Sequence, residues 1–294
     1  MESGFGEDER SAAAALIDLA LPEDLQKTGD LTCRALIRDD EPGRVQVVAR
    51  NEGVLAGGPV AEMVFAKLHA DVEWTALIED GTPLQSGDVA ATVSGPLPAL
   101  LIGERTALNF LTHLSGVATL TRAFVDAVAG TDAKILDTRK TLPGYRLLQK
   151  YAVRAGGGTN HRLGLYDGVL IKDNHLAAWS EHHQDATIAD AVRRSRGSAP
   201  EGCSIEVEVD SIEQLADALN GSPDIVLLDN MDCGTLSEAV ALRDASAPNV
   251  LLEASGSVTL ETVGDIADTG VERISIGALT HSAAALDLAF DWPS

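Results

Sequence analysis

The sequence predicts an α/β protein in which a small α+β domain is followed by a parallel α/β barrel. Over roughly the first 105 residues, short strand-like runs alternate with tight Gly, Pro and Asp turns. After residue 133, short β-branched or Leu-rich runs alternate instead with amphipathic stretches. Strand and helix repeated in this way are typical of a parallel sheet covered by helices.

The N-terminal part is expected to begin with a helix over 11–27, where apolar residues share one face. Strand-like segments follow from residue 44 and again from residue 71, with a second helix between them at 58–69. A long helical segment with few breakers then runs from 103 to 130. We predict a first domain over 1–110 and a barrel over 111–282, with the tail 283–294 packing back on the first domain.

Six apolar runs are expected to form the barrel strands. They are KILDT (134–138), DGVLI (167–171), SIEVEV (204–209), DIVLLD (224–229), NVLLEAS (249–255) and RISIG (273–277). No GxGxxG motif follows the first strand, so six or seven such units favour a closed barrel over a dinucleotide-binding open sheet. A doubly wound open sheet is the alternative.

The charge of the chain limits its partners. With 45 Asp and Glu against 22 Lys and Arg, the formal net charge is -23, which argues against nucleic acid and anionic membranes as partners. So many carboxylates and so few aromatic residues suggest a surface suited to high salt, and an ordinary acidic bacterial protein is the alternative. The N-terminus lacks the pattern of a signal peptide and no apolar run could span a bilayer, so a cytoplasmic location is expected.

One segment reverses this charge. Between Asp137 and His175, seven Lys and Arg residues stand against three acids. Several of the charged residues lie at the ends of predicted strands, where parallel barrels build their active sites. They are Arg139, Lys140, Lys172, Glu208 and Asp229. Cations together with carboxylates suggest a site for a polyanion with a divalent metal such as Mg²⁺, although Glu208 and Asp229 could equally form structural salt bridges.

Two further patterns indicate anionic ligands. The sequences SGS (255–257) and IGALTHS (276–282) follow the last two strands, where barrels frequently bind phosphate through backbone N–H groups. GGGTNHR (156–162) combines three glycines with His161 and Arg162. Because Arg binds carboxylates bidentately, this cationic segment suggests a ligand with more than one carboxylate.

The residues that carry this chemistry resemble a known family. Its motifs are ERTALNFL (104–111), LDTRKTLPGYR (136–146), GGGTNHRLGLYDGVLIKDNH (156–175), EVEVDS (206–211), LLDNM (227–231) and GALTHS (277–282). They are similar in order and spacing to the quinolinate phosphoribosyltransferases of NAD biosynthesis, over nearly the whole chain. The resemblance implies an N-terminal α/β sandwich, an incomplete α/β barrel and a homodimer. It also implies Mg²⁺, no organic cofactor, and quinolinate and 5-phosphoribosyl 1-pyrophosphate as substrates.

The resemblance also implies roles for individual residues. Quinolinate would be bound by Thr138, Arg139, His161, Arg162 and Lys172, with Arg105 reaching in from the other subunit. Lys140 would act on the phosphates in catalysis together with Glu208 and Asp229, which would meet the ribose hydroxyls and Mg²⁺. The 5-phosphate would be held by Ser255, Gly256, Ser257, Gly277 and His281. Ser257 departs from the family pattern, which often has another Gly there.

Three other functions are compatible with parts of this pattern. A related phosphoribosyltransferase acting on nicotinate would need fewer carboxylate-binding cations than this chain has. A paralogue encoded with metal-transport genes is disfavoured by the intact TRKT and NHR blocks (138–141 and 160–162). A non-catalytic dicarboxylate-binding protein would leave Glu208, Asp229 and the phosphate loops without a role.

Overall fold

The computed structural model describes residues 4–183 and 186–292, which divide into two compact units interleaved along the chain. The first unit contains the described residues of Met1–Arg122, Lys140–Gly158 and Ala278–Ser294, and the second contains Ala123–Arg139 and Thr159–Gly277. Residues 140–158 therefore belong to the same compact unit as the N-terminal residues. The division into domains at 1–110 and 111–282 stays a prediction.

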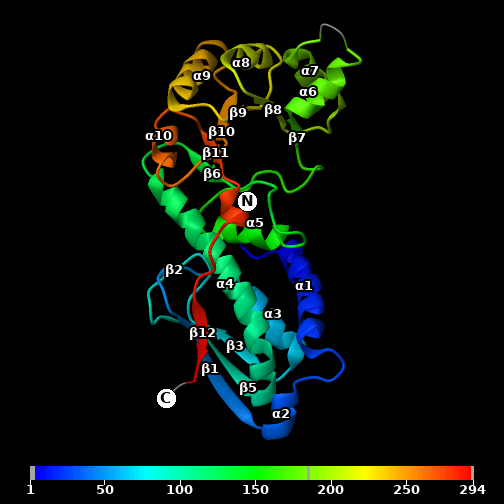
Figure 1. The fold of residues 1–294 in the computed structure, drawn as a ribbon, viewed down its shortest axis with the longest axis vertical. Coiled ribbons are helices and arrows are strands. Elements are labelled where there is room, and N and C mark those ends of the chain that lie inside the picture. Colours follow the sequence, from blue (N-terminus) through cyan, green and yellow to red (C-terminus); the bar gives the residue numbers. More distant parts are fainter. Residues whose placement is uncertain (1–3, 184–185, 293–294) are drawn as a thin grey trace. The chain divides into compact units, whose positions relative to one another are not determined.

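The first unit is built on an antiparallel sheet in the order β12-β1-β5-β3 (Figure 1). Its strands are β1 (Pro42–Ala49), β3 (Glu73–Ala76), β5 (Val89–Pro96) and β12 (Leu288–Asp291), and β2 (Gly53–Val54) pairs separately with β4 (Pro83–Leu84). The C-terminal strand β12 pairs with β1, in a register that joins Asp291 to Gln46. The chain therefore returns at its end to the sheet formed near its start.

Helices pack on this sheet through an aromatic core. The helices of the first unit are α1 (Glu7–Leu25), α2 (Leu31–Leu36), α3 (Gly58–Leu68), α5 (Arg146–Ala155), α11 (Ala278–His281) and most of α4 (Leu97–Ala127). Phe65 of α3 stacks on Trp74 of β3 and on Phe290 of β12, with ring centroids 6.1 and 5.9 Å apart. The helices expected at 11–27 and 58–69 are present, and the long helix begins earlier than expected because a proline is tolerated in its first turn.

The second unit contains a six-stranded parallel sheet in the order β6-β11-β10-β9-β8-β7 (Figure 1). Its strands are β6 (Lys134–Leu136), β7 (Val169–Ile171), β8 (Ile205–Val209), β9 (Ile225–Asp229), β10 (Leu251–Ser255) and β11 (Arg273–Ser275). Its helices are α6 (Asp173–Ser180), α7 (Ile188–Ser198), α8 (Ile212–Leu219), α9 (Cys233–Ser246) and α10 (Val263–Ala267). All six strands expected from the sequence are therefore present.

The strand order distinguishes a barrel from a doubly wound sheet. From β7 to β11 each strand lies beside the next one in sequence, and β6 then lies beside β11. This order is cyclic and has no reversal point, unlike a doubly wound sheet. Within the described ranges, β6 and β7 each pair with one strand only, so the barrel is incomplete.

Three outer helices begin at a residue whose side chain caps the helix N-terminus, and the position of that residue sets the length of the preceding strand–helix connection. Thr187, Ser211 and Asp232 accept hydrogen bonds from the first-turn N–H groups of α7, α8 and α9. None of the helices in the described part of the chain is both long and apolar enough to cross a membrane.

Candidate active site

The carboxyl ends of the parallel strands bring most of the predicted site residues to one edge of the second unit. Those residues are Thr138 and Arg139 after β6, Lys172 after β7, Glu208 in β8, Asp229 in β9, Ser255 in β10 and Gly277 after β11. In parallel α/β barrels this edge carries the active site because the loops that follow the strands converge there.

Glu208 and Asp229 lie on adjacent strands and point to the same face of the sheet. Glu208 is in register with Leu227, and Asp229 follows Leu227 by two positions, so the alternation of the strand places both carboxylates on one side. Carboxylate oxygens are hard ligands that suit Mg²⁺ when phosphate oxygens complete its coordination. The pair therefore fits a magnesium ion held partly through a substrate.

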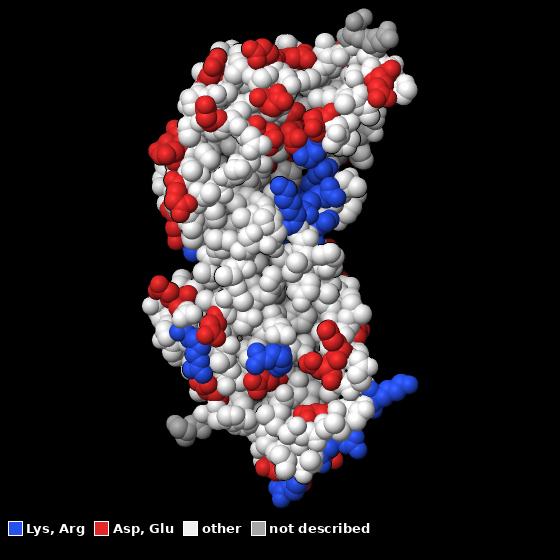
Figure 2. All heavy atoms as spheres, viewed as in Figure 1, with Lys and Arg blue, Asp and Glu red and all other residues white. Residues whose placement is uncertain are grey.

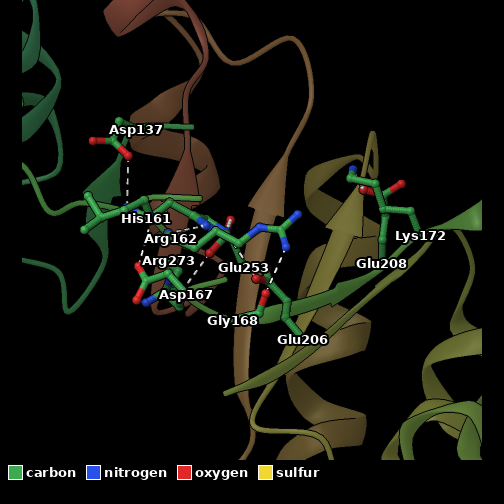
Figure 3. A network of polar contacts seen from close by, with 11 residues as sticks. Asp137, His161, Arg162, Asp167, Gly168, Lys172, Glu206, Glu208, Glu253 and Arg273 are labelled. Carbon is green, nitrogen blue, oxygen red and sulfur yellow. Dashed lines mark hydrogen bonds and ion pairs between the residues drawn. The ribbon is translucent and has the colours of Figure 1, made fainter. Parts of the chain in front are cut away.

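Lys172 is the neighbour of this carboxylate pair. Its ammonium group forms an ion pair with Glu208, seen on its own at the right of Figure 3. The Lys172 side chain is 43% exposed and that of Glu208 is 16% exposed, so the cation is the accessible partner. A cation and a carboxylate predicted to bind different substrates thus lie in direct contact.

Two arginines provide a second concentration of positive charge. The Nε atom of Arg139 is buried and has no hydrogen-bond partner among the described residues. Burial lowers the pKa of the Arg162 guanidinium, and the positive charge of Arg139 lowers it further, which shows that the two cations are close. Partly buried like charges favour a bound anion, and arginines bind carboxylates bidentately.

Figure 2 shows acidic side chains spread over this face, and it shows the basic side chains as one dense cluster in the upper half and as smaller separate groups in the lower half. A local field of this sign attracts anions to a protein that otherwise repels them.

The loop that carries Arg162 is anchored to the end of β6 by Asp137, which is fully buried. One oxygen of Asp137 accepts a hydrogen bond of 2.9 Å from the His161 N–H, and the other accepts one of 2.6 Å from the Asn160 amide group. The N–H of Thr159 also donates to the carbonyl of Ile135 at 2.8 Å. These contacts hold residues 159–162 beside the start of the predicted substrate-binding segment.

His161 is bound on both sides of its ring. Its Nε2 atom lies 3.1 Å from Glu206 and 3.4 Å from Glu253, and its Nδ1 atom accepts a 2.7 Å hydrogen bond from the Arg162 N–H (Figure 3). Burial acts to lower the pKa of His161, and the two carboxylates outweigh it and act to raise that pKa. The Arg162 contact opposes this rise, because a nitrogen–nitrogen distance of 2.7 Å leaves room for one hydrogen only. We therefore assign the proton to Nε2 and the lone pair to Nδ1.

The carboxylates around His161 differ in their ionisation. Burial raises the pKa of Glu206. Burial also acts to raise the pKa of Glu253, but the neighbouring His161 ring and the charge of Arg273 hold that pKa below its usual range. The Nε of Arg273 donates to Glu253 at 2.7 Å. Glu253 therefore ionises at a lower pH than Glu206.

The loop after β10 is closely packed against the end of β9. Gly256 has a φ of 103°, and a Cβ atom there would come within 2.1 Å of the Asn230 side-chain oxygen. Asn230 in turn donates to Asp229 at 2.9 Å. Ser257 has a φ of 45°, a left-handed conformation that favours glycine, which is the residue that the resemblance led us to expect there.

Three predicted site residues belong to the first unit and not to the second. Arg105 is an exposed residue of α4. The backbone carbonyl of Lys140 accepts a hydrogen bond from the Thr280 hydroxyl. The Nδ1 atom of His281 lies 2.6 Å from the Ser282 hydroxyl oxygen. Their roles at the site stay predictions.

Sequence reasoning did not assign Asp137, Glu206, Glu253 or Arg273 to the site. The run IEVEV contains a signal for Glu206, because side chains two residues apart in a strand point to the same face. Glu206 therefore lies on the face that carries Glu208. Glu253 and Arg273 are recognisable as partners only from the strand register, which pairs them directly.

Comparison with known proteins identifies the family. Residues 30–115 match the model of the N-terminal domain of quinolinate phosphoribosyl transferase, and residues 117–291 match that of its C-terminal domain. This chain belongs to the quinolinate phosphoribosyl transferase family. The resemblance seen in the sequence motifs is thereby confirmed.

Individual relatives of this family match almost end to end. The chain is 48% identical over 285 residues to a nicotinate-nucleotide pyrophosphorylase [carboxylating] of Mycobacterium leprae, covering 96% of this chain and 98% of that one. It is 42% identical to a probable enzyme of the same name from Bacillus subtilis, over 90% and 88% of the two chains. The solved nicotinate-nucleotide pyrophosphorylase from Francisella tularensis has a TM-score of 0.87 at 36% identity, with 96% of each chain covered. These quinolinate phosphoribosyl transferase relatives share both the sequence and the fold.

Proposed function

We propose that this chain converts quinolinate and 5-phosphoribosyl 1-pyrophosphate into nicotinate mononucleotide, pyrophosphate and CO₂, a step of NAD biosynthesis. The membership of the quinolinate phosphoribosyl transferase family supports the reaction. The observation that carries the substrate assignment is the pair Arg139 and Arg162, two adjacent cations of which one keeps a buried Nε without a partner among the described residues.

The dicarboxylate is bound by cations around the ends of β6 and β7. In this proposal Arg139, Arg162 and Lys172 receive the two carboxylates of quinolinate, with Thr138 and His161 beside them. Lys140 serves the phosphates of the second substrate, and the 5-phosphate rests on backbone N–H groups of the loops after β10 and β11. Those loops carry Ser255, Gly256, Ser257, Gly277 and His281.

The chemistry follows from charge. The pyridine nitrogen attacks C1 of the ribose, the C1–O bond breaks, and its electron pair leaves with pyrophosphate. Glu208 and Asp229 stabilise the positive charge that develops on the sugar, and Lys140 stabilises the charge of the leaving group. The ring nitrogen is then cationic, so the C2 carbon can keep the electron pair when CO₂ leaves, and it takes a proton from water.

Mg²⁺ would be held by Glu208 and Asp229 together with the ribose hydroxyls and pyrophosphate. There it would neutralise the negative charge of the departing pyrophosphate. The reaction needs no organic cofactor. Removing divalent ions with a chelator should abolish turnover, and added Mg²⁺ should restore it. Turnover that persists after chelation would contradict this part of the proposal.

We also propose a homodimer in which the exposed Arg105 of one subunit completes the site of the other. Arg105→Ala should reduce activity without changing the oligomer. Mixing it with an inactive Arg139→Ala variant should then restore activity in hybrid dimers, because one of the two sites would contain both arginines. An absence of recovery after subunits have exchanged would contradict a shared site.

The deciding assay measures pyrophosphate and CO₂ released from quinolinate, with nicotinate as the control substrate. We expect both products from quinolinate and none from nicotinate. Product from nicotinate would identify a monocarboxylate enzyme, and tight quinolinate binding without turnover in the presence of Mg²⁺ would identify a binding protein. Repeating the assay from low to molar KCl tests the proposed high-salt surface, for which activity should rise with salt. The expected cytoplasmic location stays a prediction.

A further inference from the structure

The interior of the barrel contains a buried charge cluster formed by His161, Glu206, Glu253 and Arg273. Their side chains are 9, 4, 0 and 17% exposed. Glu206, Glu253 and Arg273 come from β8, β10 and β11, and His161 comes from the loop tied to β6 by Asp137. The cluster therefore joins the loop to three strands of the sheet (Figure 3).

The cluster has the composition of a metal site, but its hydrogen bonds favour a different role. One ligand atom each of His161, Glu206 and Glu253 lies within 4.8 Å of the others. A metal would need the lone pair of Nε2, whereas Nδ1 accepts the Arg162 N–H and so leaves the ring proton on Nε2. The N–H of His161 therefore faces the two carboxylates, with Nε2 3.1 Å from Glu206 and 3.4 Å from Glu253.

Occupation of both ring nitrogens also limits what His161 can do for a substrate. A hydrogen bond from the ring to quinolinate would require one of its present contacts to break. What the ring does in this arrangement is hold the backbone of Arg162 through Nδ1. The guanidinium of the same arginine is held at its other end, because its Nη1 donates to the Gly168 carbonyl at 2.9 Å. These two contacts fix the orientation of the Arg162 guanidinium, and with it the orientation of its remaining N–H donors.

We propose that Glu206, Glu253 and Arg273 are positioning residues that act through His161 to orient Arg162 for the quinolinate carboxylates. This inference rests on the function proposed above. Arg273 fixes one oxygen of Glu253, both glutamates lie against Nε2 of His161, and Nδ1 of His161 fixes the N–H of Arg162. Substrate binding depends on this chain of contacts because small displacements of a positioned group reduce its effect strongly.

A matched pair of variants tests the proposal. Arg273 pairs with Glu253 inside the barrel, and Arg243, on α9, pairs with Glu272 at 2.7 Å while its side chain is 5% exposed. Arg273→Lys should raise the KM for quinolinate about tenfold or more, with the KM for 5-phosphoribosyl 1-pyrophosphate unchanged. Arg243→Lys should lower the melting temperature and leave both constants as they are. Equal changes in both KM values, or no change with Arg273→Lys, would overturn the proposal.

A second measurement uses the unaltered protein and does not depend on turnover. Nitrogen-15 spectra of labelled histidines, assigned with His161→Gln, should show an unprotonated Nδ1 and a protonated Nε2 at neutral pH. Added Zn²⁺, a diamagnetic ion, should leave the nitrogen-15 shift of His161 Nε2 unchanged, because Nε2 carries a proton. A protonated Nδ1, or a selective change of the His161 Nε2 shift with Zn²⁺, would sink the proposal even if the enzyme is active. Conversely, an inactive enzyme with the expected tautomer would refute the proposed function and leave the contact geometry intact.

Discussion

Glu253 and Arg273 are direct register partners on neighbouring parallel strands, and the Nε of Arg273 donates a 2.7 Å hydrogen bond to Glu253. Burying such a pair costs desolvation free energy, which is offset only when further contacts satisfy the charges. His161, 3.4 Å from the other oxygen of Glu253, provides one of those contacts. The interior of this barrel is therefore ionic where it supports the predicted substrate-binding loop.

Arg139→Lys tests the role of the Arg139 Nε, which has no hydrogen-bond partner among the described residues. Lysine keeps the charge but has no Nε donor in a fork, so we expect kcat/KM for quinolinate to fall at least ~10-fold, as for loss of a charged hydrogen bond. Steady-state kinetics measures the change. Arg194→Lys, at an exposed arginine of the same unit, is the control and should behave as the unaltered enzyme. If Arg139→Lys and Arg194→Lys gave the same constants, Arg139 would have no place in the site.

Asp137→Asn should loosen the loop that carries Arg162. The asparagine can accept one of the two hydrogen bonds that the Asp137 carboxylate accepts, so we expect a loss of about 1–3 kcal/mol in the free energy of unfolding together with a higher KM for quinolinate. Urea unfolding and kinetics measure the two effects. Asp167→Asn is the control, because Asp167 is exposed and accepts a 2.8 Å hydrogen bond from Leu163 in the same loop. A stable Asp137→Asn protein with unaltered KM would show that the anchor is dispensable.

Gly256→Ala should interfere with phosphate binding. The new Cβ would displace Asn230, which contacts Asp229, so the KM for 5-phosphoribosyl 1-pyrophosphate should rise. Gly202 has a φ of 80°, and a Cβ atom there would meet nothing within 4 Å, which makes Gly202→Ala a control for backbone strain alone. Both variants should lose about 1 kcal/mol of stability from that strain. Only Gly256→Ala should change kinetics, and identical kinetics in both would remove the loop from the phosphate site.

Glu9 and Arg154 predict how the first unit responds to acid. Burial acts to raise the pKa of Glu9, but the 2.7 Å hydrogen bond with Arg154 prevails and lowers it. A lowered pKa contributes stability above the unfolded-state value of about 4.3, and this contribution is lost as the pH falls through the folded-state pKa. Unfolding measured from about pH 7 to about pH 3 should therefore show a smaller pH dependence in Glu9→Gln. Glu7→Gln, at an exposed position on the same helix, should retain the dependence of the unaltered chain.

Much of the architecture was predictable because it depends on local pattern. Continuous apolar runs such as IVLLD identify strands that are buried on both faces, and polar residues at their ends identify the edge that carries the site. The incomplete barrel and its six parallel strands agree with these expectations. The start of α4 was harder to predict, since a proline inside an apolar run reads as a breaker unless the first turn is known.

The buried charge cluster could not be predicted in the same way. Glu206 and Glu253 lie far apart in the sequence and on strands that are not adjacent, because β9 lies between β8 and β10. Their approach to one histidine depends on the curvature of the sheet and on the anchoring of the loop by Asp137. Sequence spacing carries no information about either.

The amino-acid sequence by itself indicated the family and the order of strands and helices, and it predicted anionic ligands, because motifs, periodicity and charge are properties of neighbouring residues. The partners of each charge were decided by tertiary packing. Lys172 lies against Glu208, and His161 directs both ring nitrogens to the protein itself, because the register of parallel strands sets which side chains meet. A charged residue has a role only in relation to the groups that the fold brings within hydrogen-bond distance of it.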